Sequence, residues 1–135
     1  MTQERLVVVS YPVDEEFTRV NSEVLAGDAT VLATHELDDA QRRQALRRAE
    51  ALIAWELAGE IPVGALAEAP RLRFAQLLSA GVDALDFSVL PAGLTLASNA
   101  GAYAEAVSEH ALAMTLSLAK HLPQRHAAAA GVWRG

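Results

Sequence analysis

The sequence contains no cysteine and few basic residues, and both features exclude classes of protein. Without cysteine there is no disulfide, no thiol nucleophile and no thiolate-bound metal, and this composition fits a cytoplasmic protein. Eleven Lys and Arg residues against 17 Asp and Glu residues give a net charge of −6. An acidic balance of this size argues against a nucleic-acid surface and against a polybasic membrane patch. We therefore expect neither nucleic acid nor a membrane as a partner.

Several motifs for targeting, nucleotide binding and metal binding are missing as well. No basic segment followed by an apolar one opens the chain, so no signal peptide is indicated, and no apolar run is long enough to span a membrane. Neither a P-loop nor a Gly-x-Gly-x-x-Gly segment follows an expected strand. The histidines His35, His110, His121 and His126 show no metal-ligand spacing. The sequence therefore indicates no metal or nucleotide site, and we assign no catalytic residue.

Short apolar segments alternate with helical patterns along most of the chain. The expected strands are 6–9, 29–33, 51–55, 72–77 and 94–97, and the expected helices are 13–25, 39–50, 62–67 and 84–90. Buried strands separated by helices are typical of a parallel sheet with helices on both faces. Five such strands predict an α/β fold of the flavodoxin-like type, an open parallel five-stranded sheet of order 2-1-3-4-5. A long C-terminal crossover helix follows the sheet.

This last helical pattern runs from about residue 102 to residue 121 and is apolar on most of its circumference. Such a helix needs more than one covering surface, which the sheet, a second domain or a second copy of the chain could provide. Trp133 lies near the end of the chain, and an exposed tryptophan there indicates a contact partner. We expect a domain over residues 1–101 and a separate interdomain or dimerisation helix over 102–135. A homodimer would then form through residues 102–121 and the Trp133 region.

The segment Ser79-Ala80-Gly81 follows the fourth expected strand and is the best candidate for a ligand contact. In an open α/β sheet, ligands bind at the carboxyl ends of the strands. A turn of small residues at such a position exposes consecutive backbone N–H groups, which can hold a carboxylate or a phosphate without a charged side chain. On the residues alone, the alternative is a tight turn in which Gly81 merely permits a positive φ.

Four motifs in the later half of the chain resemble the D-isomer-specific 2-hydroxyacid dehydrogenases. Residues 72–83 (LRFAQLLSAGVD) resemble the region of the fourth strand in that family, and residues 94–103 (LTLASNAGAY) resemble the next strand and turn. Residues 107–113 (VSEHALA) are similar to the opening of the helix that follows, and residues 131–133 (GVW) are similar to the Gly-x-Trp after it. Before residue 71 the match is confined to residues 52–55 and to the alternation of strands and helices. The order and separation of the motifs make the combined resemblance specific.

The resemblance implies a two-domain oxidoreductase that transfers a hydride between NAD or NADP and a small 2-oxo or 2-hydroxy acid in the cleft between its domains. By this resemblance, backbone amides of the loop after the fourth strand hold the substrate carboxylate, and the loop after the third strand faces the cleft. The segment 98–103 matches the crossover between the domains, although packing is the alternative role for its tyrosine. The candidate substrate-binding residues are Ser79, Ala80, Gly81, Trp55, Asn99 and Tyr103.

In the family, the Gly-rich nucleotide loop, the catalytic arginine, the supporting acid and the acid/base histidine all come later than the region matched here. His110 matches the helix motif and not the catalytic histidine. We therefore expect the substrate-binding part of an NAD(P)-dependent D-2-hydroxyacid dehydrogenase, catalytically incomplete by itself and without bound cofactor, with a truncated start of the nucleotide-binding domain at its end. The alternative is a non-catalytic, stand-alone flavodoxin-like module that uses the apolar helix for interaction or oligomerisation.

Overall fold

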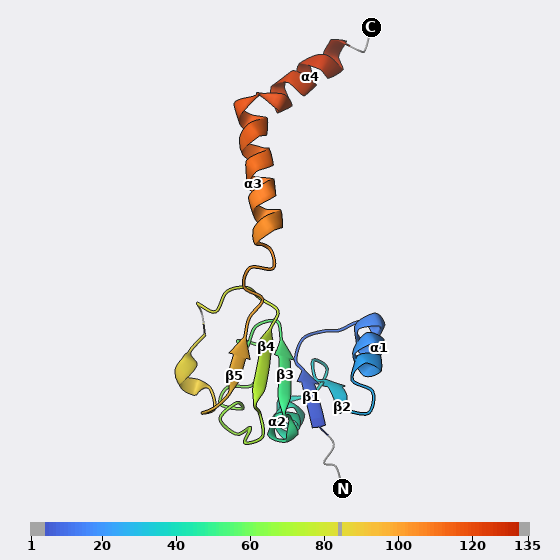
Figure 1. Cartoon of the computed structure of the whole chain (residues 1–135), viewed down its shortest axis with the longest axis vertical. Coiled ribbons are helices and arrows are strands. Elements are labelled where there is room, and N and C mark those ends of the chain that lie inside the picture. Colours follow the sequence, from blue (N-terminus) through green and yellow to red (C-terminus); the bar gives the residue numbers. More distant parts are fainter. Residues whose placement is uncertain (1–4, 84, 133–135) are drawn as a thin grey trace. The chain divides into compact units, whose positions relative to one another are not determined.

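Five short apolar segments form the strands of one parallel sheet. They are β1 (Arg5–Val9), β2 (Ala29–Ala33), β3 (Ala51–Ala54), β4 (Phe74–Leu77) and β5 (Thr95–Ala97). Their order in the sheet is β2-β1-β3-β4-β5, and every neighbouring pair is parallel (Figure 1). The predicted order 2-1-3-4-5 and the α/β class are therefore confirmed.

The computed structural model describes residues 5–83 and 85–132. By their internal contacts the residues divide into two units, Met1–Ala100 with the sheet and Gly101–Gly135 with two further helices. Trp133, expected to contribute to an interface, lies outside the described residues.

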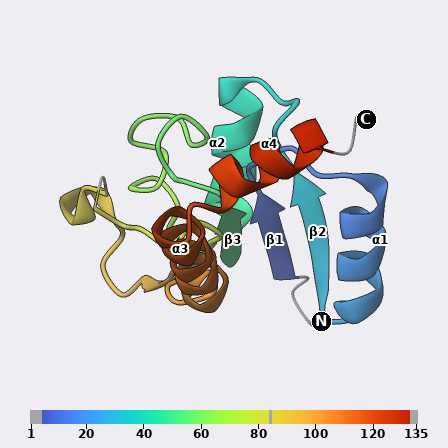
Figure 2. The ribbon, with the colours of Figure 1, turned by 90° about the horizontal axis from the view of Figure 1, so that it is seen from above.

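Two capped helices accompany the sheet in the first unit. Helix α1 (Glu15–Val24) begins after Asp14, whose carboxylate accepts a hydrogen bond from the Phe17 N–H. Helix α2 (Asp39–Arg48) begins after Asp38, which forms a capping box with Gln41. In Figure 2, α1 lies beside β2 and α2 lies near β1. The connections β1–β2 and β2–β3 run in opposite directions across the sheet, so right-handed crossovers place the two helices on opposite faces.

The hydrophobic core lies on the face of the sheet that α2 covers. The strands contribute alternate residues to it, as the two-residue period of a strand requires. Ala45 and Leu46 of α2 pack against them, together with apolar residues from the turns between residues 57 and 72. The buried strand residues of this cluster are Leu6, Val8, Leu52, Ala54, Ala75 and Leu77.

Two short helices expected from the sequence are absent or reduced. Residues 62–67 form successive turns, in which the Ala65 N–H donates to the Pro62 carbonyl and the Glu68 N–H donates to the Ala65 carbonyl. Gly64 has a φ of 78°, a left-handed conformation that interrupts an α-helix. The segment expected over 84–90 begins at a residue outside the described ones, and among its described residues, 85–90, Phe87–Val89 form a single turn of 3₁₀-helix named η1.

The second unit consists of helix α3 (Ala104–Ala119) and helix α4 (Leu122–Val132). The predicted helix corresponds to α3, whereas α4 was not predicted. His121 separates the two with a φ of 51°, the left-handed conformation that ends many helices. Within the second unit, α3 has no buried side chain among the described residues. Throughout the part of the chain that the structure describes, no helix is long and apolar enough to cross a membrane.

The central strand β3 provides a test of where the core lies. Leu52 is fully buried between β1 and β4. Replacing it with alanine should lower the free energy of unfolding by about 2–5 kcal/mol, because the lost contacts leave a cavity. Urea denaturation followed by circular dichroism measures this change. Val63→Ala is the control, since Val63 is 94% exposed and its truncation should leave stability unchanged; equal losses in both variants would contradict this placement of the core.

Candidate functional site

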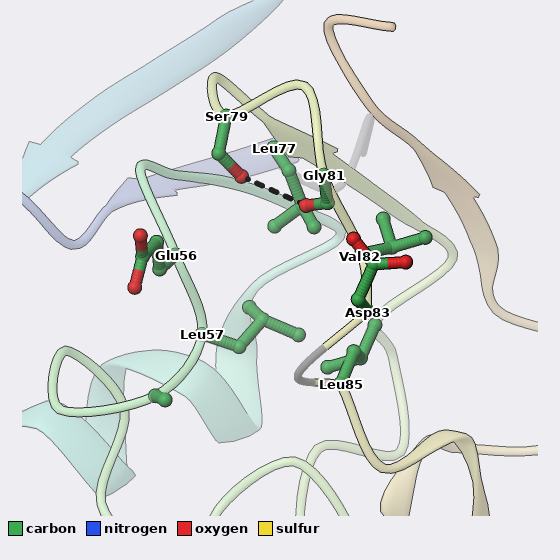
Figure 3. A pocket seen from close by; sticks show the side chains of 9 residues that line it. Glu56, Leu57, Leu77, Ser79, Gly81, Val82, Asp83 and Leu85 are labelled. Atoms are coloured by element: carbon green, nitrogen blue, oxygen red, sulfur yellow. Dashed lines mark hydrogen bonds between the residues drawn. The ribbon is translucent and has the colours of Figure 1, made fainter.

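A pocket opens at the carboxyl ends of β3 and β4, between the loops that follow these strands (Figure 3). Its volume is about 280 Å³. The loop after β3 provides Glu56, Leu57 and Ala58, and the end of β4 with its loop provides the remaining residues. These are Leu77, Ser79, Gly81, Val82, Asp83 and Leu85. The pocket therefore lies where ligands bind in open α/β sheets.

The loop after β4 presents two backbone amides that the protein leaves unused. The parallel ladder continues past the strand, since the Leu78 N–H donates to the Ala54 carbonyl at 2.9 Å and the Ser79 N–H donates to the Trp55 carbonyl at 3.2 Å. The N–H groups of Ala80 and Gly81, which come next, donate to no acceptor among the described residues. Both residues are exposed. Adjacent free amides of this kind are suited to an anion.

Gly81 does not have the positive φ that would explain a glycine at this turn. A Cβ built on it would meet only the Asp83 carboxylate, at 3.4 Å, which is an ordinary contact. The backbone conformation therefore does not require glycine here. This argues against the alternative that Gly81 is present only to allow a positive φ in a tight turn. What the missing side chain provides is open space beside the amides, within the pocket lining.

The loop after β3 has its amides occupied by the chain itself. The carboxylate of Glu60 accepts from the Trp55 N–H at 3.1 Å, from the Glu56 N–H at 2.8 Å and from the Ser10 hydroxyl at 2.6 Å. Partial burial raises the pKa of the Tyr11 phenol, and the negative charges of Glu60 and Asp14 raise it further. This network holds the ends of β1 and β3 together beside the pocket wall.

Arg42 braces the same region from α2. Its half-buried guanidinium donates to three backbone carbonyls, those of Thr34 at 3.1 Å, His35 at 2.7 Å and Glu60 at 3.4 Å. Arg42 therefore does not belong to a solvated face of α2. No local pattern indicates this role, because the three carbonyls come from two separate loops.

The structure places the six candidate residues in different positions. Ser79 and Gly81 line the pocket, and Ala80 lies between them in the same loop. Trp55 is not part of the lining, and its side chain is 50% exposed, whereas the adjacent Glu56 does line the pocket. The Asn99 N–H donates to the Ser79 carbonyl at 3.0 Å and so joins the end of β5 to the loop. Tyr103 belongs to the second unit, where it is exposed.

Sequence reasoning missed Ala58, Leu85 and above all Glu60. An acidic residue in a loop carries no local signal for the amides that it will bind. The charges of the pocket were also not anticipated, because its lining includes two carboxylates, Glu56 and Asp83, and no basic residue. In the described part of the chain, no three His, Asp or Glu side chains are arranged to hold a metal ion.

Comparison with known proteins identifies the family. The model of the catalytic domain of the D-isomer specific 2-hydroxyacid dehydrogenases matches residues 7–130, and the chain therefore belongs to this family. The fold is similar to that in the crystal structure of a D-isomer specific 2-hydroxyacid dehydrogenase family protein from Aeromonas salmonicida, with a TM-score of 0.70 and 22% sequence identity. The match covers 92% of this chain and 38% of that protein. No curated protein matches the sequence significantly.

Two glycine substitutions test the geometry of the β4 loop. Gly81→Ala should preserve the free energy of unfolding or raise it by up to about 1 kcal/mol, because its φ suits alanine and the unfolded chain loses freedom. Gly93→Ala is the matched control, since Gly93 has a φ of 82° and open space around its Cα. That variant should lose about 1 kcal/mol from backbone strain alone. A larger loss at Gly81 than at Gly93, measured by urea denaturation, would contradict the described loop.

Proposed function

We propose that this chain is the substrate-binding part of an NAD(P)-dependent D-2-hydroxyacid dehydrogenase. The free N–H groups of Ala80 and Gly81 bind the carboxylate of a small 2-oxo or 2-hydroxy acid. The single observation that carries the proposal is this pair of unused amides at the carboxyl end of a parallel strand. Membership of the family supports the reaction class.

The pocket suits a short acid. At about 280 Å³ it is smaller than the roughly 300–1,000 Å³ of sites for drug-sized ligands. Leu57, Leu77 and Leu85 give its wall an apolar part, against which a few carbon atoms of the acid can pack. The substrate carboxylate would meet the amides, and its carbon chain would lie toward the leucines.

Hydride transfer belongs to the whole enzyme in this proposal. The chain's residues do not fit a dinucleotide, because β1 is followed by Ser10-Tyr11-Pro12 and the Ser10 hydroxyl already donates to Glu60. NAD or NADP would supply the hydride elsewhere in the enzyme, and no step involving it is assigned to these residues. The role of this chain is to bind and orient the acid.

Binding of an unreactive 2-oxo acid analogue tests the proposal. Oxamate added to the ¹⁵N-labelled chain should shift the amide resonances of Ala80 and Gly81 in a saturable way. Asp83→Asn should lower the Kd by up to about fivefold, because it removes a negative charge from the pocket lining, and the repulsion between two unit charges about 4 Å apart in water is about 1 kcal/mol. Oxamide, which lacks the carboxylate, is the control ligand and should shift neither resonance.

Gly81→Ala provides the complementary variant in the same titration. A Cβ at this position would narrow the approach to the amides, so oxamate should bind more weakly although the fold is retained. Gly93→Ala should bind oxamate as the unmodified chain does, since Gly93 is not among the pocket residues. Saturable shifts elsewhere with none at Ala80 or Gly81 would refute the proposed site.

A second role as an oligomerisation module is favoured by the exposed apolar side chains of α3. Leu112, Leu116 and Leu118 are 60%, 52% and 64% exposed, which is costly for leucine in water. We propose that a second copy of the chain covers this helix in a homodimer. This role is compatible with the enzyme and does not depend on it.

Charged substitutions on α3 test the dimer. Leu112 and Leu116 lie one turn apart on the same side of the helix, so Leu112→Glu combined with Leu116→Glu should convert a dimer into a monomer. Sedimentation equilibrium gives the mass directly. Val63→Glu, at an exposed position of the first unit, is the control and should remain dimeric. An unmodified chain that stays monomeric at the concentrations used for NMR would contradict the proposal.

A further inference from the structure

Two neighbouring loops at this edge of the sheet present consecutive backbone amides, and only one pair is free. One pair, Trp55 and Glu56, directly follows β3. The other pair, Ala80 and Gly81, follows β4 after two intervening residues. The first pair donates to the Glu60 carboxylate, with one amide to each oxygen, Trp55 to Oε2 and Glu56 to Oε1. We name these two amides, together with the Ser10 hydroxyl, the β3 cradle.

The β3 cradle is a preformed anion-binding site, because its three donors already converge on a carboxylate. Ser10 is buried, with 3% of its surface exposed, and its hydroxyl donates to Glu60 Oε2 at 2.6 Å. The Ser10 N–H donates to the Ile53 carbonyl at 3.0 Å, which fixes the residue in the sheet ladder. All three donors to the carboxylate are neutral, and among the described residues Glu60 has no ion pair. If the Glu60 side chain were removed, these neutral donors could bind the carboxylate of another molecule in its place.

Glu60 also closes the segment that provides one wall of the pocket. The segment between Glu56 and Glu60 is closed by the Glu56 N–H bond to the carboxylate and by the Ile61 N–H bond to the Leu57 carbonyl at 3.2 Å. Arg42 donates to the Glu60 carbonyl from outside the loop. Glu56, Leu57 and Ala58, which line the pocket, all lie within this closed segment.

We propose that Glu60 is a positioning residue, an internal carboxylate that fills the β3 cradle, holds the Glu56–Ala58 wall of the pocket and leaves the amides of Ala80 and Gly81 as the place for a substrate carboxylate. The binding of a substrate carboxylate by Ala80 and Gly81 rests on the proposed function. The occupation of the β3 cradle by Glu60 does not. Without Glu60, a small carboxylate would have two neighbouring sites instead of one. Glu60 therefore sets the specificity of this edge for a single orientation of the acid.

Acetate, the smallest carboxylate that resembles the Glu60 side chain, is the probe. In the ¹⁵N-labelled chain with Glu60→Ala, acetate should produce saturable shifts of the Trp55 and Glu56 amides and raise the Tm more than chloride at the same ionic strength. In the unmodified chain, acetate should leave the Trp55 and Glu56 resonances unchanged, because the cradle is filled. Glu16→Ala, which removes an exposed carboxylate from α1, is the control and should show no new site.

Glu60→Gln separates filling of the cradle from a general structural role. Its amide oxygen can accept from one of the two N–H groups, so acetate should not enter, and the Trp55 and Glu56 amide protons should move upfield because a neutral acceptor is weaker. This variant also provides a test if Glu60→Ala does not fold. Unchanged Trp55 and Glu56 resonances in Glu60→Gln, or a folded Glu60→Ala in which acetate shifts neither, would overturn the proposal.

Oxamate distinguishes this inference from the proposed function. In Glu60→Ala it should shift two pairs of amides, those of Ala80 and Gly81 and those of Trp55 and Glu56. Shifts at the second pair alone would support the role of Glu60 and refute the substrate site. Shifts at the first pair alone would do the reverse.

Discussion

Parallel pairing of β3 with β4 is the constraint on which the site depends. The register sets Ala54 opposite Leu77, and the ladder continues through Leu78 and Ser79 before it stops. Because parallel strands end at a common edge, the amides beyond each strand emerge side by side without partners. Each of these amides then donates either to an acceptor of the protein itself or to a ligand. It fills the pair after β3 with Glu60 and leaves the pair after β4.

The charges around the pocket then determine how strongly it can bind an anion. Glu56 and Asp83 line the pocket without a basic residue, so only backbone dipoles would attract a carboxylate there. Charge-assisted hydrogen bonds to a cation are stronger than those to neutral donors. Within the proposed function, a cation from another part of the enzyme would strengthen the binding of the acid. Arg42 already donates to three backbone carbonyls.

The apolar helix α3 shows the limit of periodicity as evidence. Its composition indicates that the side chains favour burial, and the structure leaves Leu112, Leu116 and Leu118 exposed. A repeat of apolar residues along a helix indicates that burying them would be favourable. It does not indicate which surface buries them.

The local pattern of residues was enough to predict the five strands and the position of the Ser79-Ala80-Gly81 loop, because strand period and turn chemistry act over short stretches. The parallel order followed from the number of strands that alternate with helices. The tertiary structure alone decided the contacts of Glu60 and Arg42, which join loops that come together only once the strand order is set. It also decided that the segment around Gly64 forms turns and that His121 separates two helices. The physical reason is that a hydrogen bond between distant residues depends on the fold that positions both partners, and no short stretch of sequence encodes that position.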